Sequence, residues 1–136
     1  MRQTADTSIT IAALLADHDA RELAEQALKR CTATIAHVAI ETYSVLTRLP
    51  PSRRLASADA AAIIDARLPS TYVALNADNR ASTPSRLAAA DVSGGSTYDG
   101  LIALTALEYD LELLTRDRRA VRSYRALGAR FTLVSS

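Results

Sequence analysis

The hydrophobic positions of the chain follow two alternating periods, one typical of short β-strands and one typical of helices. Ile9, Ile11, Ala12 and Leu15 recur at helical spacing in the first of these helices. The strands are predicted at residues 3–5, 32–36, 71–75, 112–115 and 131–134. The helices are predicted at residues 8–15, 37–49, 58–68, 84–92, 98–109 and 118–127, with one more after Asp17 that carries Leu23, Ala27 and Leu28 on one face. Strands that alternate with helices predict an α/β domain with a mostly parallel central sheet.

Proline and glycine mark several of the predicted boundaries. A Pro-Pro pair ends helix 37–49, because proline cannot continue the hydrogen-bond ladder. A Gly-Gly pair forms a turn ahead of helix 98–109, and Gly128 caps helix 118–127. Helix 98–109 is apolar on nearly all sides, which predicts a central helix that its neighbours cover.

Length and composition suit one compact domain, residues 1–136, that needs no disulfide and no structural metal. The chain has a mass of 14.6 kDa and is 49% hydrophobic, which is enough for a buried core. Cys31 is the only cysteine, which excludes an internal disulfide and favours the reducing cytoplasm. The apolar run at 9–16 is too short to cross a membrane, and Asp6 stands where a secretory signal would carry basic residues.

The charged residues remove several classes of function. The net charge of +1 gives no global basic field, so any contact with nucleic acid must come from local patches. Lys29 is the only lysine, and it lies too early in the chain for a receiver domain or a haloacid-dehalogenase-like phosphatase. The phosphatase also needs a second aspartate where Ser8 stands. His18 and His37 are too few and too isolated for a zinc site, and His37 is interpreted as a helix-start or packing residue.

Four carboxylates fall where strands of the predicted sheet end. Asp6 follows the first strand, Glu41 lies about one turn into the helix after the second strand, and Asp117 follows strand 112–115. Asp99 lies in the first turn of the central helix, which reaches the same edge if the helix enters there. Ligands of parallel sheets bind at this edge, and acids gathered there attract hard cations such as Mg²⁺ or Mn²⁺. The pattern therefore favours metal-assisted hydrolysis of a phosphodiester.

Each of these acids also has a purely structural interpretation. Asp6 and Asp117 precede helices, where aspartate is a favoured N-cap. Ser96 and Asp99 have the spacing of a capping box. Glu41 lies at the edge of the apolar stripe of its helix, where the alternative is a solvated side chain. It is the placement of all four at one predicted sheet edge that favours the metal site.

Arginine and tyrosine side chains offer further candidates for contact with RNA. Arg53, Arg54 and Arg116 are candidate ligands of RNA phosphates, because arginine binds phosphate through paired hydrogen bonds. Tyr43 and Tyr98 adjoin site residues, and packing in the core is favoured for them over stacking on bases. A row of three arginines on helix 118–127 is interpreted as a solvated face. The row consists of Arg118, Arg122 and Arg125.

Four short motifs, each built around one of the acids, occur in order along nearly the whole chain. They are Ala5-Asp6-Thr7-Ser8, Glu41-Thr42-Tyr43-Ser44-Val45-Leu46, Tyr98-Asp99 and Leu114-Thr115-Arg116-Asp117. In their order, spacing and helical context they resemble the PIN-domain nucleases, especially the VapC-type toxins of toxin–antitoxin pairs. One departure lies in the first strand, where Arg2, Gln3 and Thr4 replace the buried aliphatic run that is usual in the family.

The resemblance implies a three-layer α/β/α fold with a central, mostly parallel sheet. It implies four acids that hold Mg²⁺ directly or through water, with Mn²⁺ as a substitute, and two supporting polar side chains. These residues are Asp6, Glu41, Asp99 and Asp117 for the metal, and Ser8 and Thr115 in support. It also implies an endoribonuclease that forms homodimers and a cognate antitoxin that blocks the acidic pocket. The alternative from a different class is a non-catalytic PIN-fold module that binds RNA or a protein.

Overall fold

Short parallel strands form the centre of the fold. The computed structural model describes residues 1–135. The strands are β1 (Gln3–Ala5), β2 (Thr34–Ile35), β3 (Tyr72–Val73), β4 (Glu112–Thr115) and β5 (Phe131–Leu133). β4 lies between β1 and β5, and β2 pairs with β3, all in parallel. A parallel bridge between Thr4 and Ala33 joins the two groups, so the strands follow the order β3-β2-β1-β4-β5.

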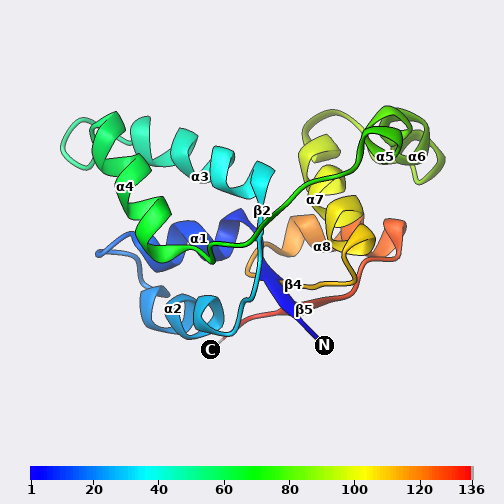
Figure 1. Ribbon diagram of the computed structural model, residues 1–136. Coiled ribbons are helices and arrows are strands. Elements are labelled where there is room, and N and C mark those ends of the chain that lie inside the picture. Colours follow the sequence, from blue (N-terminus) through cyan, green and yellow to red (C-terminus); the bar gives the residue numbers. More distant parts are fainter. Residues whose placement is uncertain (136) are drawn as a thin grey trace.

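Helices cover both faces of the sheet in two layers. One layer consists of α1 (Thr7–Leu14), α2 (Arg21–Lys29), α3 (Ala36–Thr47) and α4 (Ser57–Arg67). The other consists of α5 (Ala77–Ala81), α6 (Thr83–Ala89), α7 (Thr97–Glu108) and α8 (Arg118–Leu127), with the short 3₁₀ helix η1 (Gly94–Ser96) before α7. Figure 1 shows the first layer to the left of the strands and the second to the right. The predicted three-layer α/β/α arrangement is therefore confirmed.

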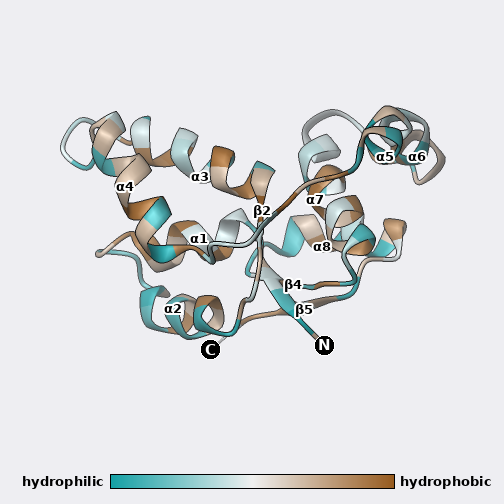
Figure 2. Cartoon of the chain, viewed as in Figure 1, coloured by the Kyte–Doolittle hydropathy of each residue, from teal (hydrophilic) through white to brown (hydrophobic). Residues whose placement is uncertain are grey.

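Each helical layer packs its own hydrophobic cluster against the sheet. Leu113 and Leu114 are neighbours on β4, and their side chains point to opposite faces, as the pleat of a strand requires. Leu114 packs with Ile9 of α1, whereas Leu113 packs with Ile102 of α7 and Tyr124 of α8. Figure 2 shows much hydrophilic surface on α2, which buries only one side. Both faces of the strands are therefore covered.

The prediction of a central covered helix is confirmed in α7. Its residues Gly100 and Ile102 to Ala106 are buried, because α7 packs between α8, α6 and the sheet. The predicted cap of α8 is also confirmed, since Gly128 has a φ of 77° in the left-handed region. Within the described residues, no helix has both the length and the hydrophobicity needed to cross a bilayer.

The structure departs most from the predicted elements at residues 32–36, 71–75, 77–81 and 84–92, and strand 71–75 is shortened to Tyr72–Val73. Helix 84–92 ends earlier, at Ala89, because Asp91 adopts a positive φ of 56° and the chain turns back there. Strand 32–36 is shortened to the two residues of β2, since Ala36 already belongs to α3. The five-residue α5 was not predicted, because its sequence ADNRA lacks apolar periodicity.

Candidate active site

The four acids predicted from the sequence line one cavity at the edge where β1 and β4 end. The cavity has a volume of about 570 Å³. The four acids on its wall are Asp6, Glu41, Asp99 and Asp117. β1 leads directly into Asp6, and β4 ends two residues before Asp117. The structure thus brings the four side chains together, with one wall formed by α1 and α3 and the other by α7 and the start of α8.

Asp6 is both the N-cap of α1 and the most deeply buried acid of the cavity. Its side chain is 3% exposed. The Oδ1 atom accepts hydrogen bonds from Ser8 N at 3.0 Å, Ser8 Oγ at 2.6 Å and Ile9 N at 3.4 Å. Burial raises the pKa of this carboxyl, while the hydrogen bonds from Ser8 and Tyr124 counteract part of that shift. The capping interpretation is therefore correct, and the same carboxylate also faces the cavity.

Tyr124 is the principal site residue that the sequence did not reveal. Its side chain is fully buried, and its hydroxyl donates a hydrogen bond to Oδ2 of Asp6 at 2.7 Å. Burial raises the pKa of this phenol, and the neighbouring charge of Asp6 raises it further. The one available signal was a large polar-tipped aromatic on the buried face of the arginine-rich α8, since a buried phenol needs a hydrogen-bond partner.

Ser8 and Thr115 connect the two strand ends that carry the acids. Their hydroxyl oxygens lie 3.4 Å apart. Ser8 Oγ accepts the backbone N–H of Arg116 at 2.8 Å, and Thr115 Oγ1 accepts the backbone N–H of Asp117 at 3.0 Å. Asp117 in turn caps α8, with its Oδ1 accepting the N–H of Arg119 at 2.9 Å. The hydroxyl pair therefore fixes the positions of Asp6 and Asp117 relative to each other.

Glu41 reaches the cavity from α3. Its Oε1 accepts a hydrogen bond from Thr7 Oγ1 at 2.9 Å and lies 3.6 Å from Nε2 of His37. The side chain of Glu41 is 34% exposed, so it lies at the rim of the apolar stripe, as the sequence indicated. Thr7, which follows the acid Asp6 directly, therefore links Glu41 to the end of β1.

A stacked pair of rings crosses from α3 to α7 beside the acids. The rings of His37 and Tyr98 are 5.1 Å apart and nearly parallel, at 8°. His37 is thus a packing residue near the start of its helix, as predicted. The prediction that Tyr43 and Tyr98 pack in the core is wrong, because these side chains are 38% and 55% exposed. Both tyrosines lie on sides of their helices that face solvent, and the spacing of residues in the sequence does not distinguish such a position from one in the core.

Asp99 is held by its surroundings and not by a capping box. Ser96 is the N-cap of α7, but its side chain makes no capping hydrogen bond, so the capping-box interpretation is wrong. Burial and the nearby charges of Asp117, Asp6 and Glu41 raise the pKa of Asp99 to about 6. Burial, together with the negative charge that the cavity concentrates, therefore makes ionisation of Asp99 less favourable than that of an exposed carboxyl.

The donor chemistry of the cavity fits a hard divalent cation. Its carboxylates are oxygen ligands, and their mutual repulsion would be relieved by a positive ion. Within residues 1–135, however, no group of three or more His, Cys, Asp or Glu side chains is gathered closely enough to hold a metal ion by itself. Mg²⁺ is commonly held by one or two carboxylates and several waters, so this wider arrangement suits Mg²⁺ better than a cation that needs a full protein cage.

The three arginines predicted to contact RNA lie in different environments. Arg116 lines the acidic cavity, and its guanidinium donates one hydrogen bond to the carbonyl of Val134 at 3.2 Å. Arg53 forms an ion pair of 3.0 Å with Asp17, and Arg54 donates to a nearby backbone carbonyl. Neither Arg53 nor Arg54 lines the cavity. A role in RNA binding remains a prediction for all three.

The fold and the comparison with known sequences define the class of protein. The model of the PIN domain matches residues 4–126, and the chain belongs to this family. The VapC-type resemblance is confirmed by two relatives from Mycobacterium tuberculosis. Ribonuclease VapC40 is 44% identical over 130 residues, which cover 96% of this chain and 97% of the relative. Ribonuclease VapC27 is 40% identical over 124 residues, which cover 90% of each protein.

A solved structure supports the same fold at lower sequence similarity. The crystal structure of VapC20 of M. tuberculosis, a toxin that cleaves the sarcin–ricin loop, superposes with a TM-score of 0.65. The match covers 87% of this chain and 92% of VapC20, with 21% sequence identity. At this identity the likeness concerns the fold, and it leaves the substrate of the present protein open.

Proposed function

We propose that the protein is a Mg²⁺-dependent endoribonuclease, the toxin of a toxin–antitoxin pair, that hydrolyses RNA phosphodiester bonds in its acidic cavity. Its named ribonuclease relatives support the reaction class, and the lining of the cavity supports the site. The observation that carries the proposal is that four acids from separate elements of the chain line one cavity. In the proposed enzyme these are the metal ligands, with Mn²⁺ as a substitute for Mg²⁺.

The residues of the cavity divide the work of such a reaction. A bound divalent cation supplies the Lewis acidity that activates water and stabilises negative charge on the phosphodiester. Asp6 is held rigidly by Ser8 and Tyr124, so its carboxylate needs little rearrangement to act as a ligand. Arg116 uses one guanidinium N–H on Val134, and the remaining donors are suited to a phosphate oxygen. Asp99 carries the unfavourable charge of the cavity, as its raised pKa indicates, and a bound cation would relieve that repulsion.

The test is cleavage of RNA by the purified full-length protein. Total RNA is incubated with Mg²⁺ or with EDTA, and new ends are mapped by sequencing. We expect cleavage with Mg²⁺ only, and a loss of at least ~100-fold for Asp6→Asn and for Asp99→Asn, since each removes a charge at the metal. Asp65→Asn is the matched control, because Asp65 is an exposed acid on α4 outside the cavity.

Two outcomes would contradict the proposal. Equal cleavage by wild type, Asp6→Asn and Asp99→Asn would assign the activity to a contaminating nuclease. RNA binding without cleavage, by protein shown to be free of any co-purified partner, would favour the non-catalytic PIN-fold module. That alternative is supported by the capping roles of Asp6 and Asp117, which give both acids a structural purpose.

The proposed biological setting is the cytoplasm, where a cognate antitoxin would block the cavity. A cationic side chain of the antitoxin, most simply an arginine, would complement the acids.

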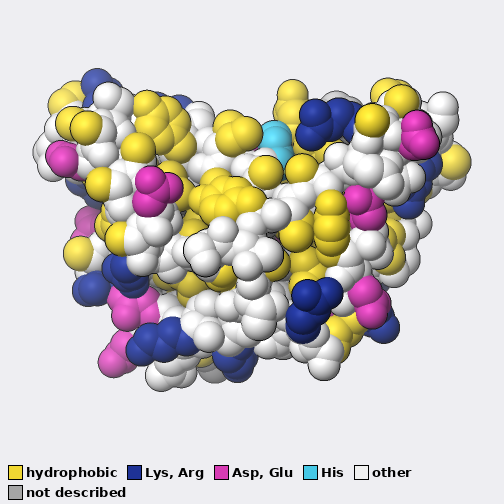
Figure 3. Space-filling model, viewed as in Figure 1, with side chains coloured by type: hydrophobic (Ala, Val, Ile, Leu, Met, Phe, Trp, Pro, Cys, Tyr) yellow, Lys and Arg dark blue, Asp and Glu magenta, His cyan; other side chains and the backbone are white. Residues whose placement is uncertain are grey.

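We further propose a homodimer that uses the apolar surface of α3, where Ile40 is 64% exposed and Tyr43 is 38% exposed. Next to Ile40 lies a mostly apolar hollow of about 440 Å³ between α3, α6 and α7. Figure 3 shows hydrophobic side chains gathered between the two helical layers. Light scattering of wild type and Ile40→Asp tests the dimer.

A further inference from the structure

A second cavity, rich in arginine, lies beside the acidic one. Arg118, Arg119 and Arg122 of α8 line a space of about 410 Å³, together with residues of the connection between α6 and α7. The sequence indicated a solvated row of Arg118, Arg122 and Arg125. The structure divides this row, because Arg125 lies over the ring of Phe131 at 5.4 Å and not in the cavity.

The charges of these arginines are not neutralised by the protein. Within the described part of the chain, none of Arg118, Arg119 and Arg122 forms an ion pair. Asp91 is the one acid on the wall of the cavity, so three positive charges face a single negative one. Three cations gathered around a single acid still repel one another, and an anionic ligand would relieve that repulsion.

The remaining wall of the cavity offers groups that suit a phosphate. Ser93, Ser96 and Ser123 line it, and their hydroxyls can donate hydrogen bonds to phosphate oxygens. The cavity runs along one side of the ten-residue α8, from Arg118 in its first turn to Ala126 near its end. Arginine provides the planar, paired donors that phosphate recognition uses.

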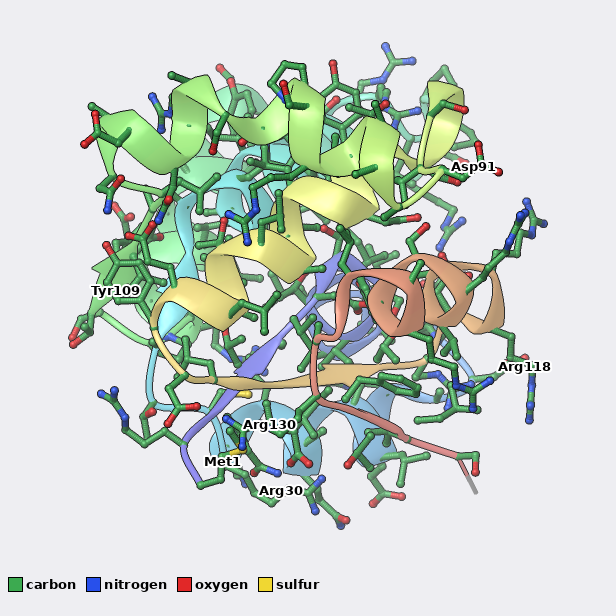
Figure 4. The ribbon with its side chains drawn as sticks, turned by 90° about the vertical axis from the view of Figure 1, so that its right-hand side faces the viewer. Met1, Arg30, Asp91, Tyr109, Arg118 and Arg130 are labelled. Carbon is green, nitrogen blue, oxygen red and sulfur yellow. The ribbon has the colours of Figure 1, made fainter. Side chains whose placement is uncertain are left out.

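The two cavities are lined by residues that neighbour one another in the chain. Arg116 and Asp117 line the acidic cavity, and Arg118, the next residue, lines the arginine cavity. The same relation holds at the start of α7, because its N-cap Ser96 lines the arginine cavity and Asp99, in its first turn, lines the acidic cavity. Figure 4 shows Arg118 and Asp91 at one edge of the molecule, opposite Tyr109 at the far end of α7. A nucleic-acid strand that enters one cavity can therefore continue into the other.

We propose that Arg118, Arg119 and Arg122 bind a backbone phosphate of the RNA strand, a short distance along the chain from the bond held in the acidic cavity. The arginine cavity thereby fixes the path of the RNA across the enzyme. This inference rests on the proposed ribonuclease function. RNA is favoured over an acidic protein segment because the metal ion proposed for the neighbouring acids would attract a phosphodiester of the same strand, whereas a row of carboxylates has no such reaction partner there.

The test measures RNA affinity separately from cleavage. Binding of a fluorescein-labelled single-stranded RNA to the full-length protein is followed by anisotropy in EDTA, with a gel to verify that the RNA stays intact. Arg118→Gln/Arg122→Gln is expected to weaken binding about tenfold or more, since each substitution removes a charge-assisted hydrogen bond to phosphate. The slope of log affinity against log salt should fall by roughly 0.7 for each phosphate that the variant no longer binds.

A matched control removes the same charge elsewhere. Arg125→Gln/Arg130→Gln also replaces two exposed arginines, but Arg125 lies over Phe131, Arg130 pairs with Asp110, and neither lines the cavity. This variant should keep RNA affinity within about twofold. An equal loss of affinity in both double variants would reduce the effect to net charge and overturn the proposal. Unchanged RNA affinity of Arg118→Gln/Arg122→Gln would overturn it as well, whether or not this variant binds inorganic phosphate more weakly.

A substitution at Asp91 should change RNA affinity in the opposite direction. Asp91→Asn removes the one negative charge of the cavity and should raise RNA affinity roughly threefold, if it lies near the bound phosphate. Asparagine tolerates the positive φ of 56° at this position, so the backbone is preserved. Failure of the ribonuclease proposal would appear separately, as absence of cleavage by wild type with Mg²⁺ despite arginine-dependent binding.

Discussion

Single residues of this site serve the fold and the proposed chemistry together. Asp6 uses Oδ1 to cap α1 and Oδ2 to receive the hydroxyl of Tyr124, yet it also faces the cavity. A buried carboxylate is costly unless it is hydrogen-bonded, and these contacts provide that compensation. The structural and functional interpretations of Asp6 and Asp117 were therefore never exclusive. A helix N-terminus at a strand end is a place where one acid can satisfy both.

Removing the hydroxyl of Tyr124 tests how strongly the buried Asp6 depends on it. Tyr124→Phe leaves Oδ2 of Asp6 without its 2.7 Å donor in a buried place. We expect a loss of about 1–3 kcal/mol in the free energy of unfolding, because the acceptor keeps its desolvation cost. Urea denaturation at neutral pH measures it. Tyr43→Phe is the control, since this exposed ring should lose less than ~0.5 kcal/mol. Equal stability of Tyr124→Phe and wild type would mean that water replaces the phenol.

The raised pKa of Asp99 predicts how stability depends on pH. The carboxyl has a pKa of about 6 in the folded protein against an ordinary value of 3.8, so the folded state retains a proton that the unfolded chain loses. The contribution of Asp99 to stability should therefore fall as pH rises from about 4 to about 6 and stay level above. Asp99→Asn removes this penalty. In EDTA its melting temperature should match that of wild type near pH 4 and exceed it at pH 7. A difference that does not change with pH would contradict the shifted pKa.

At the scale of elements, the position of Asp99 depends on how α7 packs against α6. A Cβ atom at Gly100 would overlap Cδ2 of Leu87 and approach Cγ1 of Val92 to 3.2 Å. Alanine gains about 1 kcal/mol over glycine in helix propensity, but overpacking a core costs about 1–3 kcal/mol. Gly100→Ala is therefore expected to destabilise the protein by roughly 1 kcal/mol. Chemical denaturation measures this change.

A double-mutant cycle identifies the cause of that destabilisation. Leu87→Ala alone should cost about 2–5 kcal/mol, because it leaves a cavity. Combined with Gly100→Ala, the loss of stability should be smaller than the two single losses added, since the new methyl occupies part of the space. Strict additivity, or a Gly100→Ala variant more stable than wild type, would show that the Leu87 side chain moves aside for the new methyl group and does not fix the position of α7.

The sequence predicts the bounds of an element well where several local signals agree, and poorly where they do not. β1, β4 and α8 have the predicted bounds, because period, capping and turn residues all agree there. β2 and α5 contain too few residues for a period to appear, and their bounds depend on tertiary contacts. In the site, acids at strand ends are predictable from topology. Tyr124 and the ring pair of His37 and Tyr98 are not, because they depend on how separate helices face each other.

At the scale of the whole molecule, a net charge of +1 conceals two opposed regions. The sheet edge carries the acids, and the first turns of α8 carry arginines directly beside them. Each region by itself is unfavourable, because like charges lie close together. An RNA strand with bound Mg²⁺ would neutralise both regions, because its phosphates pair with the arginines and the metal ion pairs with the acids. The charge distribution therefore suits RNA, although the overall charge gives no indication of it.

Mg²⁺ should stabilise the whole protein if the acids bind it. A ligand that binds only the folded state at about ten times its Kd adds about 1.4 kcal/mol, which corresponds to a rise of about 5 °C in the melting temperature of a domain of this size. We expect this rise for wild type and for Asp65→Asn at pH 7, measured by calorimetry against an EDTA baseline. Asp6→Asn should show little of it, because the cavity loses one of its oxygen ligands. Equal stabilisation of all three proteins would mean that the ion binds outside the acidic cavity, and the proposed metal site would then be wrong even if RNA were cleaved.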